Sequence, residues 1–319
     1  MLVGVGNRVV ALDAFRRNAD INVISHAHSD HTQGLRSGAM VLTSYETSKI
    51  LEAKSSLKIK QIAELPQGIK IEMLDSGHML GSKQIRITDS ESSEAILYSG
   101  DYQMNRPYSA GKIVIKEADT LILDSTYPHP EVEFDDSAEV AYAMQKYTND
   151  KLYRGIVLFG AYSAGKAQDI IKILNESGIT PVVGDEIGRV SSAYVECGIK
   201  LDYASMNDIP DDNFVCVTEF GKLEAMKQKL AETCKRRVFS AVATGFAKIR
   251  RFNTDVQFPL SDHADFKQAV EYIEASGAKE VLTVGGGADV FAENLKKQGY
   301  NSRRFVPWQR NLAVTPVVE

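Results

Sequence analysis

The chain has 319 residues, of which 44% are hydrophobic and 25% are charged, and its formal net charge is −5 at pH 7. This length allows one large domain or two moderate ones, and the acidic balance argues against a general coat of basic residues for nucleic acid. The sequence has no apolar run of membrane-spanning length, no signal-peptide pattern at its start and no Cys-x-x-Cys pair among its 3 cysteines, so we expect a cytoplasmic protein with no membrane partner and no thiolate metal site.

The first part of the chain is expected to be rich in strands. Short apolar runs are separated by turn residues, as is typical of β structure, and one stretch, 44–54, favours a helix. The predicted strands cover residues 8–12, 21–24, 40–43, 69–74, 84–88, 95–98 and 121–123.

From about residue 135 the pattern changes to alternating helices and strands, which indicates a parallel sheet of its own. The predicted helices are 137–147, 164–177, 222–233 and 265–276, and the predicted strands are 155–159, 180–184, 214–217, 238–243, 258–261 and 280–284. We therefore predict an α/β protein in which a first domain begins over 1–135, an inserted domain covers 136–253, and the first domain resumes over 254–319.

Half of the histidines lie in one short loop. The stretch "ISHAHSDHTQG", residues 24–34, contains His26, His28, Asp30 and His31 directly after an apolar run. Imidazole and carboxylate are the side chains that hold zinc-like divalent ions, so this spacing predicts a metal-binding loop at the end of a strand.

Two later residues fit the same pattern. His78 follows the strand-like run 69–74, and Asp101 follows the run 95–98. Because the ends of several strands can converge at one edge of a sheet, we expect these side chains to join the histidine loop around one site.

In this order and spacing, the motifs resemble those of the metallo-β-lactamase superfamily. The resemblance implies an αββα sandwich, with His26, His28 and His78 on one metal, Asp30 and His31 on a second, and Asp101 bridging the two. The implied cofactor is zinc, as one or two ions, with manganese or another divalent ion as an alternative at the second site.

Two further stretches resemble motifs of the β-CASP nucleases within that superfamily. "LDSTYPHP", residues 123–130, is similar to motif A with Asp124 as its acidic residue, and "PLSDHADF", residues 259–266, is similar to motif B with His263. "VLFGAYSAGKAQDII", residues 157–171, is similar to the opening of the inserted β-CASP α/β domain. The resemblance implies that Asp30 helps to orient the attacking hydroxide, that His263 stabilises the phosphate or protonates the leaving oxygen, and that Asp124 orients a histidine.

Lys166 and Ser261 lie within these stretches and are expected to contact substrate. The segment 160–166 also satisfies most of a phosphate-binding P-loop, but Ala167 stands where that loop needs a hydroxyl for magnesium. We therefore favour a helix start near substrate phosphates over a nucleotide site.

The stretch that corresponds to motif C departs from the RNA-processing enzymes. "VLTVGGGADVF", residues 281–291, has Gly285 where those enzymes carry a metal-binding histidine. DNA-directed relatives of the Artemis type also lack this histidine and usually carry an apolar residue, which favours a 5′ exonuclease acting on DNA. RNA processing, as in messenger 3′-end processing factors, is nearly as well supported. A catalytically inactive nucleic-acid-binding subunit and a small-ester hydrolase of the glyoxalase II type are the alternatives from other classes.

The expected partner is nucleic acid, in a single-stranded segment; the oligomeric state is not predicted. Basic residues cluster at 235–237, at 248–251 and at 303–304, and such clusters suit either a phosphate track or a solvated surface. His129 belongs to none of the motifs and is expected to be structural.

Overall fold

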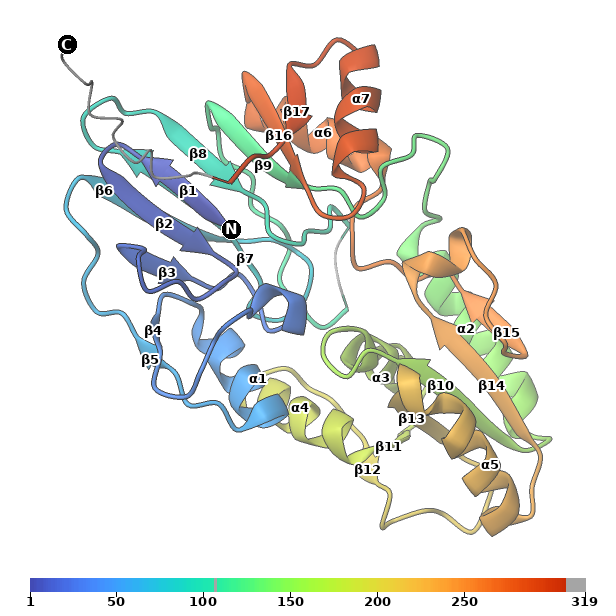
Figure 1. Cartoon of the computed structure of the whole chain (residues 1–319). Coiled ribbons are helices and arrows are strands. Elements are labelled where there is room, and N and C mark those ends of the chain that lie inside the picture. The colour runs from blue at the N-terminus through green and yellow to red at the C-terminus, as the bar shows by residue number, and fades with distance from the viewer. Residues whose placement is uncertain (106–107, 308–319) are drawn as a thin grey trace, which may run out of the picture.

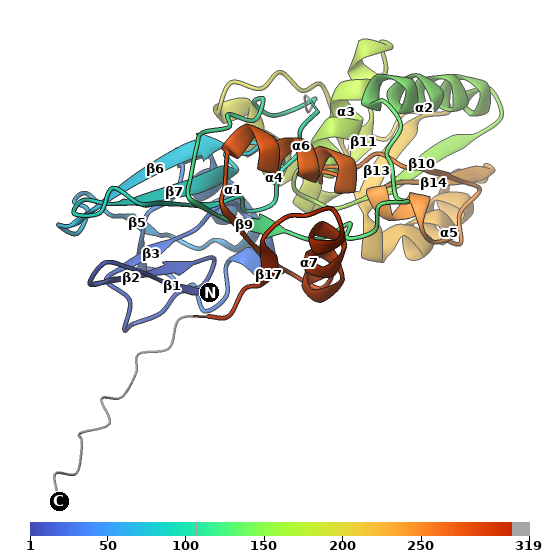
Figure 2. The ribbon, with the colours of Figure 1, turned by 90° about the horizontal axis from the view of Figure 1, so that it is seen from above.

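A computed structural model of the chain describes residues 1–105 and 108–307. Two lobes lie side by side (Figures 1 and 2), and the chain passes from the first lobe to the second and back. The first lobe contains two main sheets with helices outside them, and the second contains one parallel sheet with helices on both faces. This is the αββα sandwich with an inserted α/β domain that the sequence predicts.

The first lobe is built on a mixed sheet of six strands. Their spatial order is β17-β16-β9-β8-β7-β6. The strands are β6 (Ile69–Asp75), β7 (Lys83–Asp89), β8 (Ala95–Tyr98), β9 (Thr120–Asp124), β16 (Glu280–Val284) and β17 (Ser302–Arg304). Strand β16 pairs with β9 in parallel, with Val284 opposite Asp124. The chain leaves the first lobe after β9, and on its return from the second lobe it forms β16 next to β9.

A smaller sheet faces this one. It consists of β1 (Leu2–Val5), β2 (Arg8–Leu12) and β3 (Ile21–Val23), with the short pair β4 (Met40–Val41) and β5 (Lys60–Gln61) beyond it. Alternating apolar residues of both sheets, such as Leu12 and Ile85, are fully buried between them. The other face of the large sheet packs against α6 (Phe266–Ser276) and α7 (Ala288–Lys297), and α1 (Tyr45–Ser55) lies toward the second lobe.

The second lobe has six parallel strands in the order β12-β11-β13-β10-β14-β15. They are β10 (Ile156–Ala161), β11 (Val182–Val183), β12 (Ala204–Ser205), β13 (Val215–Glu219), β14 (Val238–Ala243) and β15 (Val256–Phe258). The helices are α2 (Ser137–Leu152), α3 (Lys166–Glu176), α4 (Asp185–Glu196) and α5 (Leu223–Cys234). The central strand β10 is buried at every position, as expected for a parallel strand covered on both faces.

Three elements of this lobe differ from the sequence-based prediction, and one of them is the short strand β12, which was not predicted. Helix α4 was not predicted, because its glycine, serines and valines are weak helix formers, and it is stabilised by packing against α1 and the insert core. The strand expected at 258–261 ends at Phe258 and begins earlier, at Val256. Since β15 pairs with β14, the inserted sheet extends past the predicted boundary at residue 253, and we propose a boundary after Phe258.

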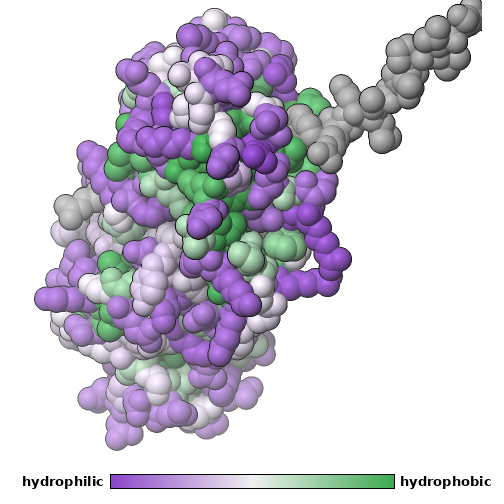
Figure 3. Space-filling view, turned by 90° about the vertical axis from the view of Figure 1, so that its left-hand side faces the viewer, coloured by the Kyte–Doolittle hydropathy of each residue, from purple (hydrophilic) through white to green (hydrophobic). Residues whose placement is uncertain are grey.

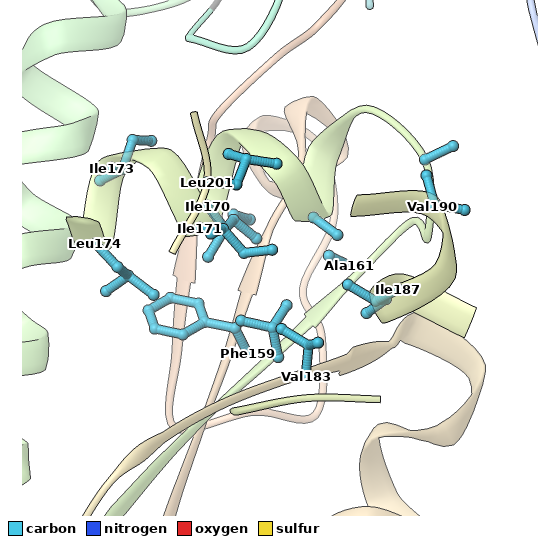
Figure 4. Packing of buried hydrophobic residues seen from close by; sticks show 14 of the residues in the cluster. Phe159, Ala161, Ile170, Ile171, Ile173, Leu174, Val183, Ile187, Val190 and Leu201 are labelled. Carbon is cyan, nitrogen blue, oxygen red and sulfur yellow. The ribbon is translucent and has the colours of Figure 1, made fainter. Parts of the chain in front are cut away.

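Phe159 lies in the core of the second lobe, so we expect truncation of its side chain to lower the stability of the protein strongly. Its ring is fully buried among the side chains of α3 and α4 (Figure 4). Phe159→Ala should lower the free energy of unfolding by about 3–5 kcal/mol, because it leaves a cavity in a close-packed core. Urea unfolding followed by fluorescence measures this loss, and Tyr153→Ala, at a side chain that is 89% exposed, is the control. Equal stability of the two variants would contradict the packing described here.

The surface is mixed in character. The space-filling view shows hydrophilic side chains over both ends of one face, with hydrophobic ones gathered between them (Figure 3). Among the described residues, no helix combines the length and apolarity needed to cross a bilayer.

Candidate metal centre

The predicted ligands come together at one edge of the first lobe, where it meets the second. His26 and His28 follow β3, Asp30 and His31 form a short 3₁₀ turn, and the remaining positions follow the ends of other strands. His78 lies in the turn after β6, Asp101 follows β8, Asp124 ends β9, and His263 lies between β15 and α6.

Four of these residues form a compact cluster. His26, His28, His78 and Asp101 each place one nitrogen or oxygen so that these atoms lie within 4.8 Å of one another. Asp101 Oδ2 is 3.4 Å from His26 Nε2 and 3.7 Å from His78 Nε2. Three imidazoles and one carboxylate are a donor set suited to zinc and similar divalent ions.

The outward nitrogens of the imidazoles are held by partners, which fixes the direction of each ring. His28 Nε2 donates to the carbonyl oxygen of Ala164 at 3.1 Å, and His78 Nδ1 donates to that of Asp262 at 2.8 Å. His26 Nδ1 lies 3.0 Å from Ser25 Oγ. With those nitrogens engaged, the opposite nitrogen of each ring faces its neighbours in the cluster, as metal-ligating histidines require.

The electrostatics keep these ligands in their metal-binding forms. Burial lowers the pKa of His26 and His28 and lowers the pKa of His78 to about 4, so all three are neutral at pH 7. Burial acts to raise the pKa of Asp101, but the facing histidines hold it well below its usual value. His26 Nε2 is buried without a hydrogen-bond partner among the described residues. A buried nitrogen without a hydrogen bond is unfavourable, and a metal ion bound to His26 Nε2 would supply the missing partner. The cluster therefore fits a divalent metal.

A second group lies on the other side of Asp101. His31 Nε2 is 3.2 Å from Asp101 Oδ1 and 3.6 Å from Asp30 Oδ2, so Asp101 stands between the two groups. His31 Nδ1 contacts Asp13 Oδ2 at 2.7 Å, and although burial opposes this, Asp101 and Asp13 raise the pKa of His31.

Sequence reasoning missed Asp13. Its carboxylate also accepts from the backbone of Ser25 and from the hydroxyl of Tyr98. Its φ of 52° places it in the left-handed region, where Asp is tolerated better than most residues. The signal was present, since Asp13 follows the apolar run 8–12 as Asp101 follows 95–98.

His263 and Asp124 form a pair next to Asp101. His263 Nδ1 is 3.0 Å from Asp124 Oδ2, and its Nε2 is 3.9 Å from Asp101 Oδ2. Burial disfavours the charged ring, but Asp101 and Asp124 outweigh it and raise the pKa of His263 to about 9. His263 therefore carries a proton at neutral pH on the ring nitrogen that faces the cluster.

Lys166 and Ser261 do not face the substrate space. The Lys166 side chain is 1% exposed, and its Nζ lies 3.6 Å from Asp262 Oδ2. Ser261 bonds within its own turn, to the backbone of His263. Neither residue is among those that line the cavity, and their contact with substrate stays a prediction. Lys166 instead balances the negative charge of the Asp262 carboxylate. The backbone carbonyl oxygen of Asp262 accepts the hydrogen bond from His78.

The motif C stretch provides no ligand. Gly285 and Val284 both line the cavity, and a side chain at Gly285 would begin 3.6 Å from Asp124 Oδ1. Val284 packs with the sandwich core, so the last side chain of β16 at the site is apolar.

The cluster opens into a cavity of about 850 Å³ between the lobes. Residues of the first lobe, including Asp30, His31 and His263, line one side, and Tyr162, Glu186 and Phe246 of the second lobe line the other. Lys54, which sequence reasoning also missed, lines the cavity as well and donates to the carbonyl oxygen of Ala27 at 3.1 Å. A cavity of this volume has room for a ligand of nucleotide size beside the cluster.

Comparison with known protein families found no matching family model. The chain is 29% identical, over 86% of its own length, to a protein of Opitutus terrae named "Probable DNA ligase", and it covers 28% of that protein. Over 41% of its length it is 34% identical to the Acidianus ambivalens protein named "Uncharacterized protein in lig 3'region", and this match covers 90% of that protein.

A third relative is the mouse "DNA cross-link repair 1A protein", with 26% identity over 54% of the chain and 17% of the mouse protein. The chain thus spans less than a third of the ligase and cross-link repair relatives. Among solved structures, a protein of unknown function from Enterococcus faecalis V583 matches 92% of the chain and 81% of its own length, with a TM-score of 0.58 and 14% identity, which supports the fold.

Proposed function

Because this chain belongs to the β-CASP nuclease group of the metallo-β-lactamase superfamily, we propose that it is a metal-dependent nuclease that trims single-stranded DNA from the 5′ end. The observation that carries this proposal is the arrangement of His263 and Asp124 beside the cluster of His26, His28, His78 and Asp101, at the edge of an open cavity.

The four cluster residues would hold the principal ion, for which zinc is the proposed identity, and Asp30 and His31 would hold a second ion with Asp101 between them. A bound divalent ion lowers the pKa of its water from 15.7 to about 7 and draws charge from the phosphate. Without a histidine at Val284 or Gly285, the second position has fewer protein ligands, so we propose that it is weakly held.

The chain's own residues supply the proton transfer. Asp124 accepts from His263 Nδ1 and keeps the ring turned so that Nε2–H faces the reacting phosphate. His263 then donates this proton to the leaving 3′ oxygen, a role worth about 10²–10⁴-fold in rate. The water oxygen stays on phosphorus, so the shortened strand keeps a 5′-phosphate and the released nucleotide a 3′-hydroxyl.

This product suggests a place in DNA joining. A DNA ligase requires a 5′-phosphate, and two relatives carry names that refer to DNA ligases or their genes. We propose that the enzyme prepares 5′ ends for a ligase. Gly285 at the motif C position lacks the histidine of the RNA-processing enzymes, and its neighbour Val284 is apolar, which supports the DNA preference expected when the histidine is lost.

Metal removal tests the proposal. The chain is treated with a chelator, dialysed, and incubated with 5′-labelled single-stranded DNA and RNA of the same sequence, with zinc, manganese or no metal. We expect cleavage only with added metal, release of mononucleotides from the 5′ end, and faster turnover of DNA. Preferred cleavage of RNA would reassign the substrate to RNA processing. Hydrolysis of a thioester without cleavage of either strand, or binding without any cleavage, would refute the nuclease.

A further inference from the structure

Aromatic rings gather on the second lobe at the rim of the cavity. Tyr162 follows β10, Phe220 follows β13, and Phe246, Arg250 and Phe252 follow β14. We call these five residues the aromatic strip. They occupy the carboxyl ends of neighbouring parallel strands, which is where open α/β sheets place their ligands.

The rings contact one another in a continuous line. Tyr162 and Phe220 are nearly parallel, at an interplanar angle of 19° and a centroid distance of 6.2 Å, and Phe220 meets Phe252 edge to face at 5.4 Å. The Arg250 guanidinium lies 4.7 Å from the Phe252 centroid and 5.0 Å from that of Phe246. These contacts hold the rings and the cation in a fixed arrangement before any ligand arrives.

Tyr162 and Arg250 of the strip are exposed, Phe220, Phe246 and Phe252 are half-buried, and the strip reaches the cavity of the metal centre. Tyr162 is 47% exposed, and both Tyr162 and Phe246 line the cavity. Tyr162 lies two positions before Ala164 in the sequence, and the carbonyl oxygen of Ala164 accepts the hydrogen bond from His28. A strand lying along the rings therefore leads directly to the cluster.

The charges around the strip suit a polyanion. In the basic cluster at 303–304, Arg303 pairs with Glu280 at 2.9 Å and Arg304 with Asp289 at 2.6 Å. In the cluster at 248–251, Lys248 pairs with Asp135, whereas no carboxylate within the described ranges pairs with Arg250 or Arg251. The guanidinium groups of Arg250, within the strip, and of Arg251, next to it in the sequence, thus keep their charge available for phosphates.

We propose that the aromatic strip binds unpaired bases of single-stranded nucleic acid by stacking, while Arg250 and Arg251 contact its phosphates, and so guides the strand to the metal centre. This inference rests on the proposed function, since it assigns the residues that receive the single-stranded substrate. Bases in a duplex are already stacked on each other and cannot use the rings, so the strip selects single strands.

Binding is measured by fluorescence anisotropy with fluorescein-labelled oligo(dT) of about 15 nucleotides, which suits the site sizes of such surfaces. A chelator is present, so no cleavage occurs. We expect Tyr162→Ala to raise the Kd about tenfold, because loss of one stacked base is commonly worth that much. Arg250→Ala should also raise the Kd, because it removes a phosphate contact. Tyr162→Phe should restore near-wild-type binding, since it keeps the ring. A blunt duplex of the same length should compete poorly.

The matched controls lie at the opposite end of β10. Tyr153→Ala and Arg154→Ala remove an exposed aromatic ring and an arginine from the same lobe, and both should leave the Kd unchanged. Equal losses in these controls, unchanged Kd in the strip variants, or no binding by the wild type would overturn the inference. Hydrolysis of bis(p-nitrophenyl) phosphate by the metal-loaded wild type tests the proposed function separately, because this small diester can react at the metal centre without a strand lying along the strip.

Discussion

Asp101→Asn should abolish nuclease activity by removing the metal. Asp101 faces His26, His78, His31 and His263, and an amide in its place loses the charge that both metal positions share. We expect turnover to fall more than about a hundredfold, beyond the loss that outer-partner mutations cause. Metal content measured by mass spectrometry should fall in parallel.

Thermal unfolding separates metal loss from misfolding. An ion that binds only the folded chain raises the Tm of the wild type, and this rise should be absent in Asp101→Asn. His129→Ala is the control, because this half-exposed loop histidine lies outside the cluster. A variant that keeps both its metal and its zinc-dependent Tm would show that Asp101 is not a ligand.

His263→Ala should leave metal content near normal and lower turnover of DNA by about 10²–10⁴-fold, as expected for loss of a general acid. Asp124 Oδ2 accepts from His263 Nδ1, no other described side chain bonds to that oxygen, and the ring's Nε2 is thereby turned toward the site. Single-turnover assays on labelled DNA measure the effect.

The leaving group supplies the decisive comparison for His263. A p-nitrophenolate leaves without help from an acid, so His263→Ala should slow bis(p-nitrophenyl) phosphate hydrolysis much less than DNA cleavage. Equal losses on both substrates would assign His263 to phosphate or metal binding instead. Asp124→Asn should show the same selectivity more weakly, because the imidazole remains but loses its anionic partner.

The parts of the site carried by local sequence were predictable. The histidine loop follows one strand directly, and His78 and Asp101 each follow an apolar run. Their positions after predicted strands were enough to indicate that these side chains meet at one site. The parallel βαβ order of the insert was also predictable from its alternating pattern. These features depend on spacing within a few residues, which a single sequence records.

The parts set by packing between lobes were not predictable. Lys166 looked like a phosphate contact, but burial against Asp262 depends on how α3 docks onto the first lobe. The same docking stabilises α4 against α1, despite weak helix formers. The aromatic strip was missed because Tyr162, Phe220 and Phe252 are far apart in the sequence and meet only when the parallel strands align.

The hydrogen bond from His28 Nε2 to Ala164 joins a ligand of the first lobe to the backbone of the second. Seating of the inserted lobe therefore orients one of the imidazoles on which the cation depends. Linkage makes this relation reciprocal: by whatever factor a seated lobe tightens cation binding, the bound cation favours the seated arrangement. The cation and this contact between the lobes therefore stabilise each other, and chelation should weaken the contact as well as stop the chemistry.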